Sequence, residues 1–189
     1  IVSTGMLVIK PSGWTLTEAT SITPDGSVIV GWGTNPAGDT EGWIARLFPT
    51  TVSSYCTSST TTNGCNPSIL GVGIPSATSA SGFTLHASDI EGQRSGLFFY
   101  GLAPTATPWH VNSSSWMCVV PPRVRTTILD SGGAAGSCDG SLALDWNEWR
   151  AANPGAVGSP FGAGQVLYAQ AWFRDPPAAK GTNLSNALQ

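Results

Sequence analysis

The four cysteines restrict the fold of this 189-residue chain more than any other feature. Zinc is held by closely spaced Cys or His pairs, and neither the cysteines nor the two histidines are spaced in that way. We therefore expect two disulfides and an oxidising compartment. Of the three possible pairings, the spacing favours the local ones, Cys56 with Cys65 and Cys118 with Cys138. Each local bridge would contribute roughly 2.5–3.5 kcal/mol on the loop-entropy model.

The composition indicates an all-β protein. Charged residues make up 10% of the chain, against about a quarter in an average globular domain. Gly, Pro, Ser and Thr take their place, which suits short strands joined by tight turns, whereas the wet face of a helix needs Glu, Lys and Arg. The eight Trp residues argue against disorder, which is typical of chains with few aromatics.

Charge and hydropathy exclude two classes of partner. The formal net charge is -3, and the basic residues are scattered along the chain, whereas nucleic-acid binding requires a basic stripe. No apolar run reaches the ~18 residues of a membrane helix. We therefore expect no nucleic acid as a partner and no membrane span. The chain begins at Ile1 with no visible signal peptide, which we interpret as processing or as a segment of a longer protein.

Residues 1–49 have the pattern of a β-meander. Asp25-Gly26 precedes the apolar run Ser27–Gly31, which is a strong hairpin signal. The stretch Gly33–Asp39 is dense in turn residues, and Glu41–Leu47 predicts another strand. Tryptophans recur at these strands, and we interpret them as packing residues, with a sugar-stacking platform as the alternative: Trp14, Trp32 and Trp43.

Residues 10–48 resemble the autotransporter-type HAF repeat of secreted bacterial proteins. The matching features are a first Trp strand, an Ala-x-x-Ile-x-x-Asp-Gly turn at Ala19–Gly26, a Val-rich strand that ends in Gly, and a closing Trp strand. The resemblance implies one blade of a propeller-like sheet. Because one blade cannot bury both of its faces, we expect this single copy to pack on the next domain or to follow further repeats upstream.

We expect a polar linker at residues 50–66, stapled by the Cys56–Cys65 bridge, and a second domain at residues 67–189. Pro and Gly punctuate six expected strands of this domain at sandwich-like spacing: Ser68–Gly73, Gly82–Ser88, Gly96–Gly101, Trp116–Val120, Ser141–Leu144 and Gln165–Phe173. A short helix is expected at Trp146–Ala152. Asp145 can cap this helix, and Glu148, three residues on, completes a capping box.

Residues 55–189 also resemble a C-terminal domain that is common in large secreted proteins of planctomycetes and similar bacteria. Four markers carry the resemblance: Gly96–Gly101, Met117-Cys118, Gln170–Pro176 and Asn183–Leu188. The resemblance implies an antiparallel β-sandwich with no assignable activity at the end of an exported or surface protein. The family usually carries one more strand after the closing Ala-Leu. We therefore expect an unpaired sheet edge beside Gln165–Phe173.

No catalytic constellation stands out, and we expect a protein that is not an enzyme. The sequence has no Gly-x-Ser-x-Gly nucleophile elbow, and we interpret His86 and His110 as structural or solvated. The carboxylates are better explained by turns, caps and strand ends than by a glycosidase pair: Asp89, Glu91, Asp145, Glu148 and Asp175. The acidic loops lack the spacing of a calcium-binding EF-hand, so we expect no metal and no cofactor.

We expect a non-enzymatic extracellular structural or interaction module of a bacterial surface protein. Its partners would be copies of itself or other cell-surface proteins. One form of this hypothesis is a filament, in which Val2–Ile9 of one subunit completes the open sheet edge of the next. The alternative is a carbohydrate-binding accessory module, with polysaccharide as the partner and exposed Trp residues as the platform.

Overall fold

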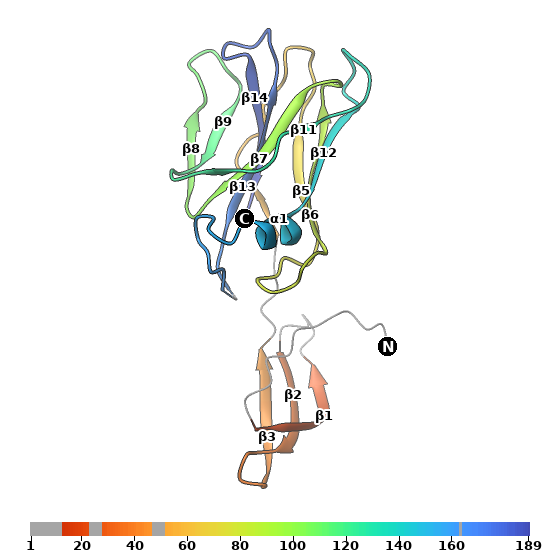
Figure 1. Cartoon of the computed structure of the whole chain (residues 1–189), viewed down its shortest axis with the longest axis vertical. Helices are drawn as coiled ribbons and strands as arrows, with labels where there is room; N and C mark the ends of the chain where they lie inside the picture. Colours follow the sequence, from red (N-terminus) through yellow and green to blue (C-terminus); the bar gives the residue numbers. More distant parts are fainter. Residues whose placement is uncertain (1–12, 23–27, 47–51, 163) are drawn as a thin grey trace. The chain divides into compact units, whose positions relative to one another are not determined.

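The computed structural model describes residues 13–22, 28–46, 52–162 and 164–189 (Figure 1). The chain is almost entirely β and divides into two compact units, Ile1–Pro49 and Thr50–Gln189. Its named strand pairs are antiparallel, and two disulfides cross-link the second unit. The expected all-β fold class is therefore confirmed. Within the described residues, the single helix spans seven residues and is too short to cross a membrane.

The first unit is the expected meander. Its sheet has the order β1 (Thr15–Ile22), β2 (Val28–Thr34) and β3 (Thr40–Arg46). The turn between β2 and β3 is closed by Asn35, whose side-chain oxygen accepts hydrogen bonds from the Ala37 and Asp39 N–H groups, both at 2.9 Å.

Two tryptophans of the first unit have different surroundings. The Trp43 ring lies across Gly31, where an added Cβ would approach the ring to 2.3 Å. Trp32 is 40% exposed, and its ring N–H donates to Glu18. The packing interpretation therefore suits Trp43 better than Trp32. The expected Asp25-Gly26 turn and the Val2–Ile9 stretch lie outside the described residues.

The second unit consists of two facing sheets and a hairpin. The large sheet has the order β10-β7-β13-β14-β4, with β11 also paired to β7. Its strands are β4 (Ser54–Tyr55), β7 (Ser95–Gly101), β10 (Val124–Arg125), β11 (Leu129–Asp130), β13 (Tyr168–Arg174) and β14 (Thr182–Leu188). The small sheet has the order β12-β6-β5, and its strands are β5 (Ser68–Gly73), β6 (Phe83–Ile90) and β12 (Gly140–Asp145). The hairpin consists of β8 (Pro104–Pro108) and β9 (Trp116–Val119).

The main core lies between the two sheets. Phe98, Tyr100 and Phe173 of the large sheet cluster with Leu85 and Leu142 of the small sheet, and each of these side chains is at most 3% exposed. These residues alternate along their strands with residues that point to the other face, as the two-residue period of a strand requires. All six strands expected from the sequence are present, with ends shifted by up to three residues.

Helix α1 (Trp146–Ala152) lies at one end of this unit (Figure 1). Asp145 caps the helix, as predicted, by accepting a hydrogen bond from the Glu148 N–H at 3.0 Å. Its second carboxylate oxygen accepts from the Gly82 N–H at 2.8 Å. The pKa of Asp145 is lowered, first by the bond from Gly82 and then by the bond from Glu148, because both stabilise the charged form.

Aromatic contacts fasten this helix to the large sheet. The rings of Trp146 and Trp149 meet the Tyr100 ring edge-on, at centroid distances of 4.8 and 5.8 Å. The Tyr100 hydroxyl donates to the Val157 carbonyl at 2.7 Å. Burial raises the pKa of Tyr100 to about 12.

The expected disulfide pairing is wrong. Cys56 is bonded to Cys118, and Cys65 to Cys138, over separations of 62 and 73 residues. The reason is tertiary, because β4 pairs with the last strand, β14, and this pairing carries Cys56 to β9. On the loop-entropy model each long bridge contributes about 4 kcal/mol, more than a local bridge would.

The segment expected as a linker belongs to the second unit. Residues 54–55 form β4 at the edge of the large sheet, and both cysteines of the segment are linked to residues more than 60 positions away. Thr61 is buried and accepts a hydrogen bond at its hydroxyl from the Cys65 N–H. The polar character of the segment therefore reflects hydrogen bonding inside the unit, and not a linker.

The unpaired edge expected beside Gln165–Phe173 does not exist. β13 pairs with β7 on one side and with β14 on the other, and β14 pairs in turn with β4. β13 is therefore an inner strand of the large sheet. The strand-exchange hypothesis loses the edge on which it rested.

Candidate functional site

The outer face of the large sheet, on the side away from the small sheet, carries a second set of apolar residues. Leu97 and Phe99 of β7 lie opposite Trp172 and Gln170 of β13 in the antiparallel register, so the four side chains share this face. Phe98 points to the main core instead.

The β8–β9 hairpin covers part of this outer face, as Figure 1 shows. Met117 and Val119 of β9 form a buried cluster with Leu97, Phe99 and Leu184 of the sheet. Beside the hairpin, the same face forms a half-open groove of about 560 Å³. This volume lies in the usual range of ligand sites, roughly 300–1,000 Å³.

Aromatic, aliphatic and arginine side chains line the groove. The apolar lining residues come from the sheet, the hairpin and the segment after β8: Leu97, Phe99, Trp109, Met117, Val124 and Trp172. Arg123 and Arg125 complete the lining. Arg125 lies opposite Phe99 in the register of β10 and β7, which places it on the outer face.

A buried amide holds the hairpin against the sheet. Gln170 is 0% exposed, and its side-chain oxygen accepts from the Cys118 N–H at 3.1 Å. Its side-chain nitrogen donates to the carbonyls of Trp116 and Ser185, at 2.8 and 2.7 Å. The two ends of this amide therefore connect β9 to β13 and β14, and the hairpin side of the groove is preorganised.

A disulfide and a tyrosine fasten the hairpin at the same point. Cys118 of β9 is bonded to Cys56, and its carbonyl accepts from the Tyr55 hydroxyl at 2.6 Å. Burial is the main cause that raises the pKa of Tyr55, and the neighbouring Tyr168 adds to it. The hydroxyl therefore stays protonated, as a donor, at neutral pH.

Four of the six Lys and Arg residues of positions 50–189 stand around the groove. Arg123 and Arg125 line it directly. The Arg174 guanidinium lies over the Trp172 ring at 5.5 Å from the ring centroid, and the Lys180 ammonium lies over Trp109 at 4.0 Å. Indole faces attract cations through their quadrupole, so each tryptophan of the groove has a positively charged side chain over its ring.

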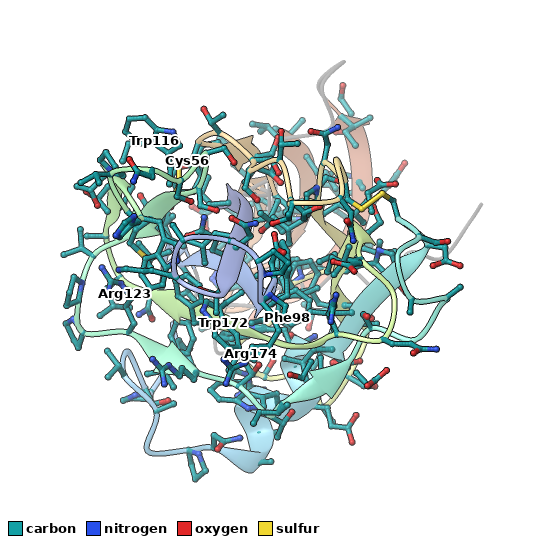
Figure 2. All side chains as sticks on the ribbon, turned by 90° about the horizontal axis from the view of Figure 1, so that it is seen from above. Cys56, Phe98, Trp116, Arg123, Trp172 and Arg174 are labelled. Atoms are coloured by element: carbon teal, nitrogen blue, oxygen red, sulfur yellow. A yellow bond between two sulfur atoms is a disulfide. The ribbon has the colours of Figure 1, made fainter. Side chains whose placement is uncertain are left out.

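A hydrogen bond to the backbone of another residue holds the Arg123 side chain beside the groove. Its Nε donates to the Val119 carbonyl at 2.6 Å. Burial lowers the pKa of Arg123, but an arginine starts from a value so high that it keeps its charge at neutral pH. In Figure 2, Arg123, Trp172 and Arg174 lie away from Trp116 and Cys56.

The candidate catalytic residues do not come together in one site. His86 lies on β6 next to the buried Leu85 and is only partly buried, on the opposite face, as the alternation predicted. His110 lies between β8 and β9 and accepts a hydrogen bond from the Asn112 N–H at 3.3 Å. In the described ranges, no three His, Cys, Asp or Glu side chains come together as a possible metal site.

The carboxylates are engaged elsewhere. Glu91 is buried and forms a salt bridge with Arg94 at 2.5 Å. Asp175 is also buried, and one of its oxygens accepts from the Thr62 N–H and the Asn183 amide, at 2.8 and 2.5 Å. Asp175 therefore forms no salt bridge with the neighbouring Arg174, which lies over Trp172 instead.

The residues of the groove do not stand out in the sequence. The arginines look scattered there, because Arg123 and Arg174 are 51 positions apart. The sequence does contain part of this pattern. In an extended chain, Arg123 and Arg125 point to one face, and so do Trp172 and Arg174, because each pair is two positions apart. The pairing of β10 with β7 and of β7 with β13 was needed to bring them together.

No family model matches the sequence, and no curated protein or solved structure proved similar to it. The resemblances to the HAF repeat and to the planctomycete C-terminal domain therefore stay predictions. What the protein does has to be argued from the groove.

Proposed function

We propose that this chain is a non-enzymatic secreted interaction module that holds a saccharide in the groove on the outer face of its large sheet. One observation carries the proposal: Trp109 and Trp172 line the same half-open groove. A pyranose ring has an apolar C–H surface that packs against indole rings, while its hydroxyl groups bond to polar side chains at the rim.

The shape of the groove supports a chain-like ligand. A half-open groove leaves both neighbours of a bound sugar free to continue, whereas an enclosed cavity buries most of a small ligand. The site is also preorganised, since Gln170 and the Cys56–Cys118 bridge hold the hairpin in place without a ligand. Preorganisation reduces the entropy lost on binding.

The two disulfides support a place outside the cell. Disulfides persist in oxidising compartments and are rare in the cytosol. A secreted module with an aromatic groove fits the carbohydrate-binding alternative more closely than the filament hypothesis. Filament formation by strand exchange stays a prediction, and it now needs an edge other than that of β13.

Affinity electrophoresis of the full chain in gels that contain xyloglucan, mixed-linkage β-glucan, pectin or alginate tests the proposal. We expect retardation by at least one polymer. Trp172→Ala should weaken that binding by at least about 30-fold, as loss of a central aromatic contact does. Trp116→Ala is the matched control, because Trp116 is 36% exposed on the same hairpin but does not line the groove.

Two results would contradict the proposal. One is free migration of the wild-type chain in every polymer. The other is an equal loss of binding in Trp116→Ala and Trp172→Ala, because the groove would then have no special part in it.

A further inference from the structure

The charges around the groove point to a more specific ligand. Resting on the saccharide site proposed above, we infer that the ligand is an acidic polysaccharide whose sugars carry carboxylates, and not a neutral one. Arg123, Arg125, Arg174 and Lys180 would bind those carboxylates, while Trp109 and Trp172 contact the sugar rings.

Positive charge is unevenly distributed within the second unit. Its two remaining cations are engaged elsewhere: Arg94 pairs with Glu91, and Arg150 donates to the Ser79 carbonyl. The chain as a whole is acidic, with a formal net charge of -3. Four positive charges on one face of an acidic protein therefore mark that face as a site for an anion.

Within the described residues, these four cations lack carboxylate partners. No Asp or Glu of those residues lines the groove, and the salt bridge found among them is the distant Glu91–Arg94 pair. Asp130 also lies on this face, since its strand partner is Ser95 at the end of β7. One oxygen of Asp130 accepts from the Gly132 N–H at 2.8 Å.

The chemistry of the cations also suits a carboxylate ligand. A guanidinium presents a planar fork of N–H groups that matches a carboxylate, and three of the four cations are arginines. Arg174 and Lys180 lie over indole rings. A carboxylate on a sugar in the groove could therefore meet these charges without breaking an existing ion pair.

A sugar acid fits this site better than a nucleic acid. Nucleic-acid binding proteins commonly present an extended basic surface that tracks many phosphates, whereas here the cations are confined to one groove of about 560 Å³. Single-stranded DNA is nevertheless included as a probe in the test.

The test is to titrate the full chain with an oligogalacturonate and, separately, with its methyl ester, and to measure each affinity by isothermal titration calorimetry. The two probes share one sugar skeleton and differ in charge. We expect the acid to bind at least about 10-fold more tightly than the ester, because hydrogen bonds to charged groups are the stronger ones. Binding of the acid should weaken as NaCl is raised from 50 to 500 mM.

Two single substitutions locate the effect. Arg174→Gln should weaken binding of the acid by about 10-fold or more and weaken binding of the ester by a smaller factor. Arg150→Gln removes the same charge from helix α1, away from the groove, and should leave both affinities unchanged. Circular dichroism of each variant checks that it is folded.

The possible results test the acidic ligand and the saccharide site separately. Equal affinity for acid and ester, or equal losses in Arg174→Gln and Arg150→Gln, would overturn the acidic ligand and leave a neutral saccharide site standing. If neither sugar binds, an oligoalginate, which is also a polyuronate, is titrated next. If none of the three saccharides binds, or if only the single-stranded DNA probe, oligo-dT, binds tightly, the saccharide site and the acidic ligand are both overturned.

Discussion

Replacing Gln170 with Leu removes the polar contacts that hold the hairpin side of the groove. The Gln170 side chain is fully buried and bonds three backbone groups: the Cys118 N–H, the Trp116 carbonyl and the Ser185 carbonyl. Leucine has a similar size but no polar atoms. In Gln170→Leu, all three groups therefore lose this partner inside the protein.

The size of the effect follows from these three groups. Leaving a buried donor or acceptor without a partner costs about 1–3 kcal/mol, so the three together cost about 6 kcal/mol at the middle of that range. Burying the leucine side chain offsets about 2 kcal/mol of this. We expect the free energy of unfolding of the second unit to fall by roughly 4 kcal/mol, a large share of the 5–15 kcal/mol of a typical domain.

Urea unfolding of the full chain measures this loss, and amide hydrogen exchange at Cys118 measures the local opening of the hairpin. Gln165→Leu is the control, because Gln165 is exposed and its bonds go to an exposed loop. It should cost less than about 1 kcal/mol, as most surface substitutions do. A loss below about 1 kcal/mol in Gln170→Leu, or full protection of the Cys118 amide, would refute the reasoning.

Two further predictions concern a disulfide and a helix cap. Peptide mapping without reduction should find Cys56 linked to Cys118, and replacing both with Ser should lower the stability by about 4 kcal/mol; a peptide that links Cys56 to Cys65 would contradict the fold. Because the pKa of folded Asp145 lies below its ordinary 3.8, its charged form stabilises the fold above that pH, and the stabilisation is lost as the pH falls through the folded value. The stability of the wild type relative to Asp145→Asn should therefore decrease when the pH is lowered from 7 to below 3.8, and a difference that does not change with pH would exclude this role.

Local patterns were enough to predict most of the elements. The strand at Ser68–Gly73 and the helix at Trp146–Ala152 have the expected bounds, because turn residues and a cap mark their ends in the sequence itself. The strand at Thr182–Leu188 was not predicted, since it mixes leucines with Asn and Ala, which are depleted in strands. Its polar side chains are satisfied by distant partners, as when Ser185 accepts from the Ala171 N–H and Asn186 from the Ile69 N–H.

By itself, the sequence determined that the chain is β, that it is cross-linked and where its turns lie. These properties depend on residue types and on neighbours a few positions apart. The disulfide partners, the closed edge of β13 and the cationic groove depended on the pairing of strands far apart in the chain. Strand register sets which side chains share a face, and a shift of one residue would move Trp172 and Arg174 into the core side of the sheet. Only the tertiary structure could therefore place two tryptophans and four cations around one groove.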